Sequence, residues 1–282
     1  MLHVDEPALD GLTAPVLVVA FEGWASAGSA GTVAADHLAR EAVTAAAFDT
    51  DALYDYRVSR PAAEFLDGVL TSVEWPSLTI RRLAGDPDLL VMSGPEPNWN
   101  WKRFSAEVAG FAERIGVTMQ ISLGGIPWAA PHTRPVAITT TASRPDLLGE
   151  EPNAAEGPLS VPAAAAIAVE HAVSGRGIDT VGLWARVPHY VGGAYYPAAL
   201  SLAERVAART GAAVDLESLA AEAAEQQRRL DESVTGQPQV EALVGRYEEL
   251  YDAQGSIPSG EEIAAEFERF LRGQSDDDGG LG

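Results

Sequence analysis

The sequence predicts an α/β fold: a three-layer α/β/α sandwich on a mostly parallel sheet, followed by a C-terminal helical appendage. Two observations predict this class. Up to about residue 212, short apolar runs alternate with helical patterns, which is the order of a parallel sheet covered by helices on both faces. Beyond that point the apolar runs stop and helical patterns follow one another. A length of 282 residues suits one large domain with such an appendage.

The predicted strands are short runs of apolar and β-branched residues. In chain order they are Val16–Ala20, Ala42–Phe48, Leu53–Val58, Leu78–Leu83, Leu89–Ser93, Val117–Leu123, Val136–Thr140 and Thr180–Val187. The first of them is apolar throughout, which is typical of a strand buried on both faces.

The predicted core helices are Ser26–Arg40, Trp101–Ile115, Ser160–Val173 and Pro197–Arg209. The second has an apolar stripe at helical spacing, made by Phe104, Val108, Phe111 and Ile115. Asn100 can cap its start, and Gly116 can end it. Pro162 suits the first turn of the third helix, and Gly211 closes the fourth.

Three further helices are expected at Asp215–Glu232, Val240–Ala253 and Glu261–Leu271. The middle one carries an apolar stripe, made by Val240, Leu243, Val244, Tyr247, Leu250 and Tyr251, which predicts packing on the core or on another subunit. Residues 215–282 hold 17 acidic and 5 basic residues. We therefore expect an α/β core at 1–212, an acidic helical segment at 213–273 and a disordered tail at 274–282.

The charge of the chain excludes several classes of partner. At a formal net charge of −22, nucleic acids and anionic membranes are poor partners for its surface. No run of 18 apolar residues predicts a membrane helix, and the absence of cysteine excludes disulfides and thiolate metal sites. We expect a cytoplasmic protein with no metal and no cofactor.

The stretch FEGWASAGSAG, Phe21–Gly31, lies between the first predicted strand and helix, where a Gly-rich turn often holds phosphate. Its spacing fails the dinucleotide fingerprint after Gly23, and Ser29 stands where a P-loop needs lysine. The nucleophile-elbow pattern fails as well. We predict that Gly28 and Gly31 instead let the helix lie close to the sheet. Free N–H groups at the helix start could still hold another anion.

Polar and aromatic residues follow several predicted strands. Because ligands bind beyond the carboxyl ends of parallel strands, we expect these residues to gather at one edge of the sheet. The candidate binding residues are Glu22, Gly23, Trp24, Arg57, Arg60, Asn98, His132, Arg134, His189 and Tyr190. They predict either a pocket or a recognition surface.

Each candidate has two interpretations. Glu22 could be a general base or a partner of the following helix dipole. His132 and His189 could act as acids or bases, or make structural hydrogen bonds. The arginines could bind a carboxylate or phosphate, or pair with the protein's own carboxylates.

Six short motifs in order over about residues 15–210 resemble the proteasome assembly chaperone 2 (PAC2) family, in its actinobacterial-like branch. They are AFEGW, Ala27-Gly28, YDYRVSRP, GPEPNWNW, PHTRP and VPHYVGG. The resemblance implies an α/β/α sandwich akin to nucleoside phosphorylases. It also implies an assembly or binding role, and self-association, with trimers as one form.

The chain departs from the family pattern at two places. Ala25, Ser26 and Ser29 stand where members often carry polar or acidic residues, which weakens a site built there. The sequence ends Gly280-Leu281-Gly282 rather than in the hydrophobic-Tyr-any tripeptide of proteasome-docking proteins, so we do not expect docking by that route.

Two functional hypotheses follow. The first is a non-catalytic assembly-chaperone-like or protein-binding protein, with itself and a proteasome-related or other protein as partners. The second is a small-molecule-binding protein or an enzyme of phosphorylase or hydrolase type that uses a pocket at the strand ends. A buried acid or base beside an open space would favour the second.

We predict that the chain does not bind ATP. The family is sometimes labelled ATP-grasp, but the glycine motifs fail and Lys102 is the only lysine. In a thermal-shift titration, Mg-ATP should leave the melting temperature of the wild type and of Lys102→Ala unchanged. Stabilisation that grows with ATP concentration would contradict this.

Overall fold

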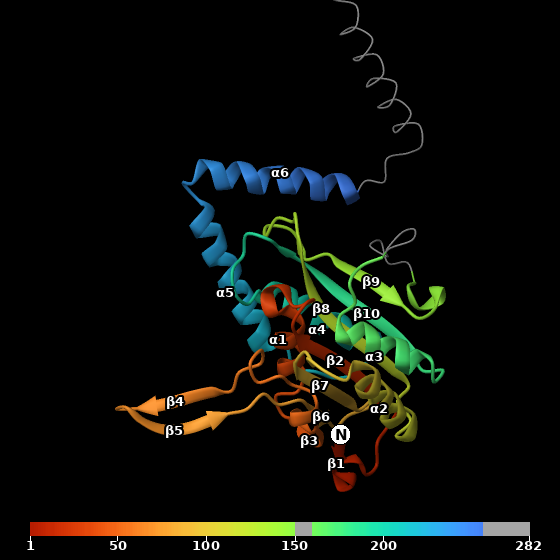
Figure 1. Ribbon diagram of the computed structural model, residues 1–282. Helices are drawn as coiled ribbons and strands as arrows, with labels where there is room; N and C mark the ends of the chain where they lie inside the picture. The colour runs from red at the N-terminus through yellow and green to blue at the C-terminus, as the bar shows by residue number, and fades with distance from the viewer. Residues whose placement is uncertain (150–159, 256–282) are drawn as a thin grey trace, which may run out of the picture.

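The computed structural model describes residues 1–149 and 160–255. Within these residues eight strands form one sheet in the order β1-β3-β6-β7-β2-β8-β10-β9, with helices on both faces (Figure 1). The predicted α/β class is therefore confirmed. No helix in this part of the chain is long and apolar enough to cross a membrane.

Four parallel strands make the centre of the sheet. They are β7 (Leu89–Pro95), β2 (Val16–Glu22), β8 (Met119–Trp128) and β10 (Asp179–Pro188). All four are rich in fully buried apolar residues, because helices cover both faces of the sheet here. The sequence predicted all four.

Antiparallel strands complete both sides of the sheet. On one side lie β6 (Thr79–Leu83), β3 (Val43–Phe48) and β1 (Leu2–Val4), and on the other lies β9 (Ile138–Ala142). The antiparallel direction was not predicted, since periodicity reports burial rather than strand direction.

Two helices cover each face of the sheet (Figure 1). One face packs against α1 (Ala30–Leu38) and α4 (Tyr196–Thr210), and the other against α2 (Trp101–Arg114) and α3 (Ala165–Ser174). Each face has its own cluster of buried apolar residues, so the sheet separates two cores as in a three-layer sandwich.

Gly31 explains the small-residue run of α1. A Cβ atom at this position would lie 2.5 Å from the carbonyl oxygen of Leu123 in β8. Only glycine therefore allows this close approach of helix and strand. The predicted role of Gly31 is confirmed.

Two expectations about helix starts are wrong. Asn100 adopts a left-handed conformation, with φ of 57°, and its side chain donates to the Ala52 carbonyl at 2.8 Å instead of capping α2. The third helix begins at Ala165 rather than near Pro162, because the carboxylate of Glu96 accepts the Ala165 N–H at 2.6 Å and fixes the start there.

The predicted strand Leu53–Val58 is also wrong. The segment follows the 3₁₀ helix Thr50–Ala52 and contains turns without strand pairing, and Val58 N–H donates to the Asp55 carbonyl at 2.8 Å. Leu53 and Tyr54 are buried in the core, so the apolar pattern reflects burial without strand pairing.

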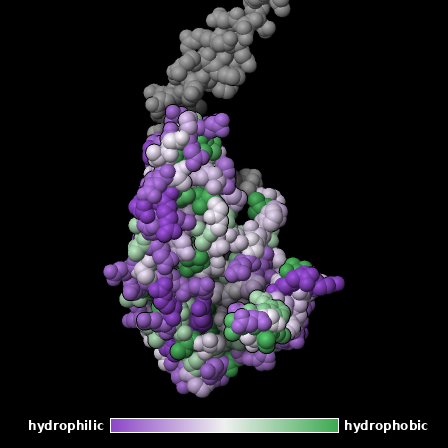
Figure 2. All heavy atoms as spheres, turned by 90° about the vertical axis from the view of Figure 1, so that its left-hand side faces the viewer, coloured by the Kyte–Doolittle hydropathy of each residue, from purple (hydrophilic) through white to green (hydrophobic). Residues whose placement is uncertain are grey.

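An unpredicted hairpin follows this turn. Its strands are β4 (Ala62–Leu66) and β5 (Val69–Glu74), and Figure 1 shows them projecting well away from the sheet. Its large apolar side chains are exposed: Phe65, Leu66, Val69, Leu70 and Val73. The face of the molecule toward which the hairpin points mixes hydrophobic and hydrophilic residues (Figure 2).

The C-terminal helices α5 (Glu217–Val234) and α6 (Pro238–Gly255) were both predicted. α5 packs against α4, and α6 crosses above the sheet (Figure 1). The predicted helix Glu261–Leu271 and the predicted tail lie outside the described residues. The 3₁₀ helices of the described residues are Glu6–Leu9, Ala27–Ser29, Thr50–Ala52 and Pro145–Leu147.

The carboxyl group of Glu170 is buried between α3 and the sheet. Oε1 of Glu170 is inaccessible to solvent and has no hydrogen-bond partner among the residues that the structure describes. Burial raises the pKa of this carboxyl to about 7, although a hydrogen bond with Ser122 opposes the rise. An acid with a raised pKa in the fold binds its proton more tightly when folded, so its ionisation destabilises the fold as pH rises.

We predict that Glu170→Gln stabilises the protein in a pH-dependent way. The gain should grow between about pH 5 and pH 8, to at most about 3 kcal/mol, because wild-type Glu170 must ionise over that range whereas Gln cannot. Urea unfolding at several pH values measures it, with Glu249→Gln as the exposed control. A difference from the wild type that does not change with pH would refute the prediction.

Candidate functional site

The parallel register places the ends of four strands at one edge of the sheet. Glu22 pairs with Pro95, and Trp128 with Pro188, so the loops after β2, β7, β8 and β10 share what we call the carboxyl edge. The candidate residues that follow these strands, Glu22, Asn98, His132 and His189, thus belong to one edge of the sheet. A binding role for them remains a prediction.

His132 lies buried at this edge between a tyrosine and a carboxylate. The Tyr190 hydroxyl accepts the backbone N–H of His132 at 2.8 Å and lies 2.7 Å from ring Nδ1. Since that hydroxyl accepts the backbone proton, it is placed to donate its own to Nδ1. The ring proton then sits on Nε2, which lies 3.3 Å from Oδ1 of Asp231 in α5.

The contact with Asp231 is electrostatic rather than a formed hydrogen bond, because Nε2 of His132 has no partner of suitable geometry within residues 1–149 and 160–255. Burial lowers the pKa of His132 and outweighs the opposing charges of Asp231 and Glu248. Burial also raises the pKa of Tyr190 to about 12. The group therefore favours a neutral imidazole and a protonated phenol.

Helix α6 covers the neighbouring part of the edge. His189 Nε2 lies 2.7 Å from the Tyr247 hydroxyl, and the Tyr190 and Tyr247 rings stack with centroids 6.4 Å apart. Thr133 donates to Glu248. The loops after β8 and β10 are thereby held against α6.

Arg134 binds the same helix through two carboxylates. Its guanidinium donates to Asp252 at 2.9 and 2.8 Å and to Glu248 at 3.1 Å. The hydrogen bonds with Asp252 raise the pKa of Arg134. Of the two interpretations that the sequence left open, the geometry favours pairing with the protein's own carboxylates.

The turn after β2 is braced by Glu96, which the sequence analysis missed. Its carboxylate accepts the Trp24 N–H at 3.3 Å in addition to the Ala165 N–H, and its own N–H donates to the Glu22 carbonyl at 2.7 Å. A Cβ atom at Gly23 would lie 2.5 Å from that carboxylate. Gly23 is thus required for close approach, and Glu96 joins three distant segments.

Asn98 stabilises the adjacent loop instead of facing solvent. Its side-chain oxygen accepts the Asp55 N–H at 2.9 Å and the Ser59 hydroxyl at 3.1 Å. Arg57 donates to Asp55 at 2.9 and 2.7 Å, and these bonds lower the pKa of Asp55 to about 2. Arg60 is exposed on the same loop.

Three tryptophans are exposed at the carboxyl edge. Trp24 follows β2, Trp99 follows β7, and Trp128 ends β8; they are 69%, 50% and 39% exposed. The Arg186 guanidinium lies 4.5 Å from the Trp128 ring centroid. Of the three, Trp24 alone was a predicted binding residue, although all three follow predicted strands.

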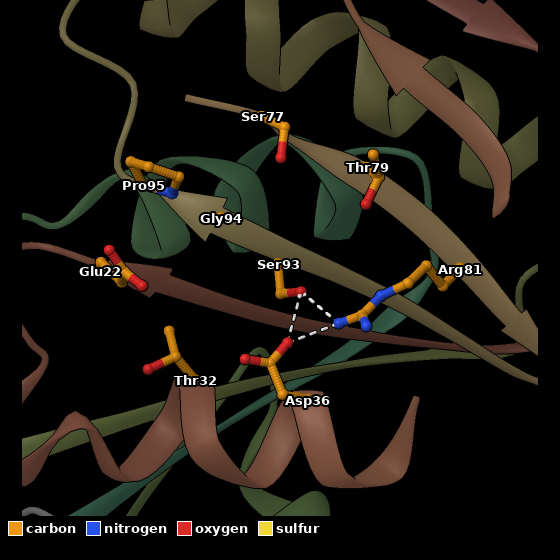
Figure 3. Close-up of a pocket in the computed structure, with 9 residues that line it drawn as sticks. All are labelled: Glu22, Thr32, Asp36, Ser77, Thr79, Arg81, Ser93, Gly94 and Pro95. Atoms are coloured by element: carbon orange, nitrogen blue, oxygen red, sulfur yellow. Dashed lines mark hydrogen bonds and ion pairs between the residues drawn. The ribbon is translucent and has the colours of Figure 1, made fainter. Parts of the chain in front are cut away.

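A polar cavity of about 300 Å³ opens beside α1 (Figure 3). Its lining includes Glu22, Thr32, Asp36, Thr79, Arg81 and Ser93. Arg81 Nη2 donates to Asp36 at 2.6 Å and to Ser93 at 2.8 Å. Only Glu22 of this group was a candidate. Asp36 lies within a helix and Arg81 within a strand, so no local motif marked them.

In the described residues, no three His, Asp or Glu side chains gather as a metal-ligand set.

The chain is similar to one family and to several solved structures. The PAC2 family matches residues 20–234. A Corynebacterium glutamicum protein of unknown function is 29% identical, with 90% of this chain and 97% of that one covered and a TM-score of 0.84. A Mycobacterium tuberculosis protein of unknown function is 34% identical, covering 90% and 91%, also with a TM-score of 0.84.

A second Mycobacterium tuberculosis protein, described as a proteasome-assembly chaperone homologue, is 32% identical. The match covers 82% of this chain and 99% of that one, with a TM-score of 0.75. No curated protein matches the chain.

We predict that acid weakens the buried His132 group. Because its folded pKa is lowered, the neutral imidazole stabilises the fold fully above the unfolded pKa of about 6.5, and this contribution is lost as pH falls below that value. His132→Gln should therefore cost more stability at pH 8 than at pH 5 in urea unfolding. An equal cost at both pH values would contradict a buried neutral His132.

Proposed function

We propose, since this chain belongs to the PAC2 family, that it is a non-catalytic, assembly-chaperone-like protein whose client binds at the carboxyl edge of the sheet. The observation that carries the proposal is the exposure of Trp24, Trp99 and Trp128 at that edge. Tryptophan is enriched among the residues that dominate protein–protein binding energy.

The rest of the edge supports a recognition surface. Glu96 and Asn98 hold the loops that carry Trp24 and Trp99, so these side chains are presented from braced backbone. A rigid loop lowers the entropy that binding must overcome. The relative described as a proteasome-assembly chaperone homologue suggests unassembled proteasome subunits as the client.

We further propose that the chain forms a homo-oligomer, for instance a trimer, through the β4–β5 hairpin. Phe65 and Leu66 are 65% and 66% exposed. An isolated two-stranded hairpin is at best marginally stable in water, so a projecting apolar hairpin favours packing against another copy.

If the client binds at the carboxyl edge, substitution of Trp24 or Trp99 should weaken client binding without lowering the stability of the fold. The chain should bind unassembled actinobacterial 20S α or β subunits and change their rate of assembly. Trp24→Ala and Trp99→Ala should each weaken binding by about 2 kcal/mol and leave the melting temperature nearly unchanged, since both side chains are exposed. Calorimetry and native gels measure binding and assembly. Absence of binding to either subunit would refute this client.

The oligomer proposal predicts a mass that depends on the hairpin. Light scattering at micromolar concentration should give a multiple of 29.6 kDa, and Phe65→Glu with Leu70→Glu should give the monomer. Val161→Glu, at another exposed apolar residue, is the matched control and should leave the mass unchanged. A monomeric wild type would overturn the proposal.

A further inference from the structure

We infer that the cavity beside α1 binds a ligand through a primary ammonium group, with the carboxylate of Glu22 as its counter-ion. This inference goes beyond the protein-binding role and does not depend on it. The second functional hypothesis requires a pocket, and this inference assigns a specific ligand chemistry to that pocket.

The cavity lies where α1 meets the ends of β2, β6 and β7. Thr32 and Asp36 of α1 form one wall, Thr79 and Arg81 of β6 another, and Glu22 closes one end (Figure 3). The site is therefore built from four elements that the sheet and α1 hold in place.

The charges of the lining select a cation. Nη2 of Arg81 donates to Asp36 and Ser93, so the charge of Arg81 is offset within the cavity wall, while its buried Nε has no hydrogen-bond partner among the described residues. Glu22 is exposed to solvent, and in the part of the chain that the structure describes its side chain has no hydrogen-bond or ion-pair partner. One uncompensated carboxylate in a protein of net charge −22 disfavours phosphate and other anions and attracts a cation.

The hydrogen-bonding groups select an ammonium group in particular. An ammonium group has three N–H donors and no acceptor. Its binding site therefore needs a carboxylate together with further oxygen acceptors. The hydroxyl groups of Ser77 and Thr79 line the same cavity as Glu22 and can accept such bonds. None of the nine lining residues is aromatic, so no platform exists for stacking a nucleobase.

The volume of about 300 Å³ is at the lower limit of ordinary ligand sites. It suits a small hydroxylated amine or the end of a lysine side chain from another protein. Both present the same ammonium chemistry, and matched probes distinguish them. Glucosamine represents the small amine, with N-acetylglucosamine as its uncharged counterpart. Nα-acetyl-lysine methylamide represents the side chain, with its Nε-acetylated form as counterpart.

Isothermal titration at low ionic strength tests the inference on the full chain. At least one charged probe should bind, and its uncharged counterpart should not. Glu22→Gln keeps the size of the side chain but removes its charge, and it should weaken binding by about fivefold or more, which corresponds to about 1 kcal/mol. Glu41→Gln, at an exposed carboxylate outside the cavity lining, should bind as the wild type does.

Preference for glucosamine identifies a small-molecule site, and preference for the lysine probe identifies a protein side chain; either supports the inference. Three results would overturn it: no binding of either charged probe up to about 10 mM, which is weaker than most specific sites; equal binding of charged and uncharged partners; or unchanged binding in Glu22→Gln. A melting temperature equal to the wild type's would show that the Glu22→Gln variant is folded.

Discussion

The parallel register of β7, β2, β8 and β10 is the constraint on which the rest of the structure depends. It brings the ends of four strands, which are far apart in sequence, to one edge of the sheet. The proposed client surface and one end of the proposed ligand site are attached there: the braced turn after β2, the three exposed tryptophans, the buried His132 group and the end of the cavity beside α1. A shift of one residue in any pair would turn buried side chains toward the opposite core.

The central strands, most helices and the shared edge could be predicted from the sequence, because burial and helical periodicity leave a local pattern. Prediction from the sequence failed where buried residues do not pair in a strand, and where the residues of a strand are not buried. Leu53 and Tyr54 are buried in a turn, so they looked like a strand. The apolar residues of the two hairpin strands are exposed. The hairpin projects away from the main sheet, so the burial pattern that marks the strands of that sheet does not apply to it.

The remaining parts of the site depend on contacts between distant residues. Glu96 fixes the start of α3 across 69 positions, and Arg134 binds Asp252 across 118. The Arg81–Asp36 pair joins a strand to a helix across 45. No short motif encodes such contacts, because each partner is ordinary in its own segment. Where alternatives were open, as for Arg134, only the three-dimensional partners decide between them.

Hydrogen–deuterium exchange of the β4–β5 amides tests most directly whether the exposed apolar surface is an interface. A two-stranded hairpin without packing opens readily. If the hairpin packs against another copy, amides in residues 62–74 of the wild type at micromolar concentration should exchange nearly as slowly as those of β2 and β8. Exchange of these amides as fast as in an unprotected loop would contradict association through the hairpin.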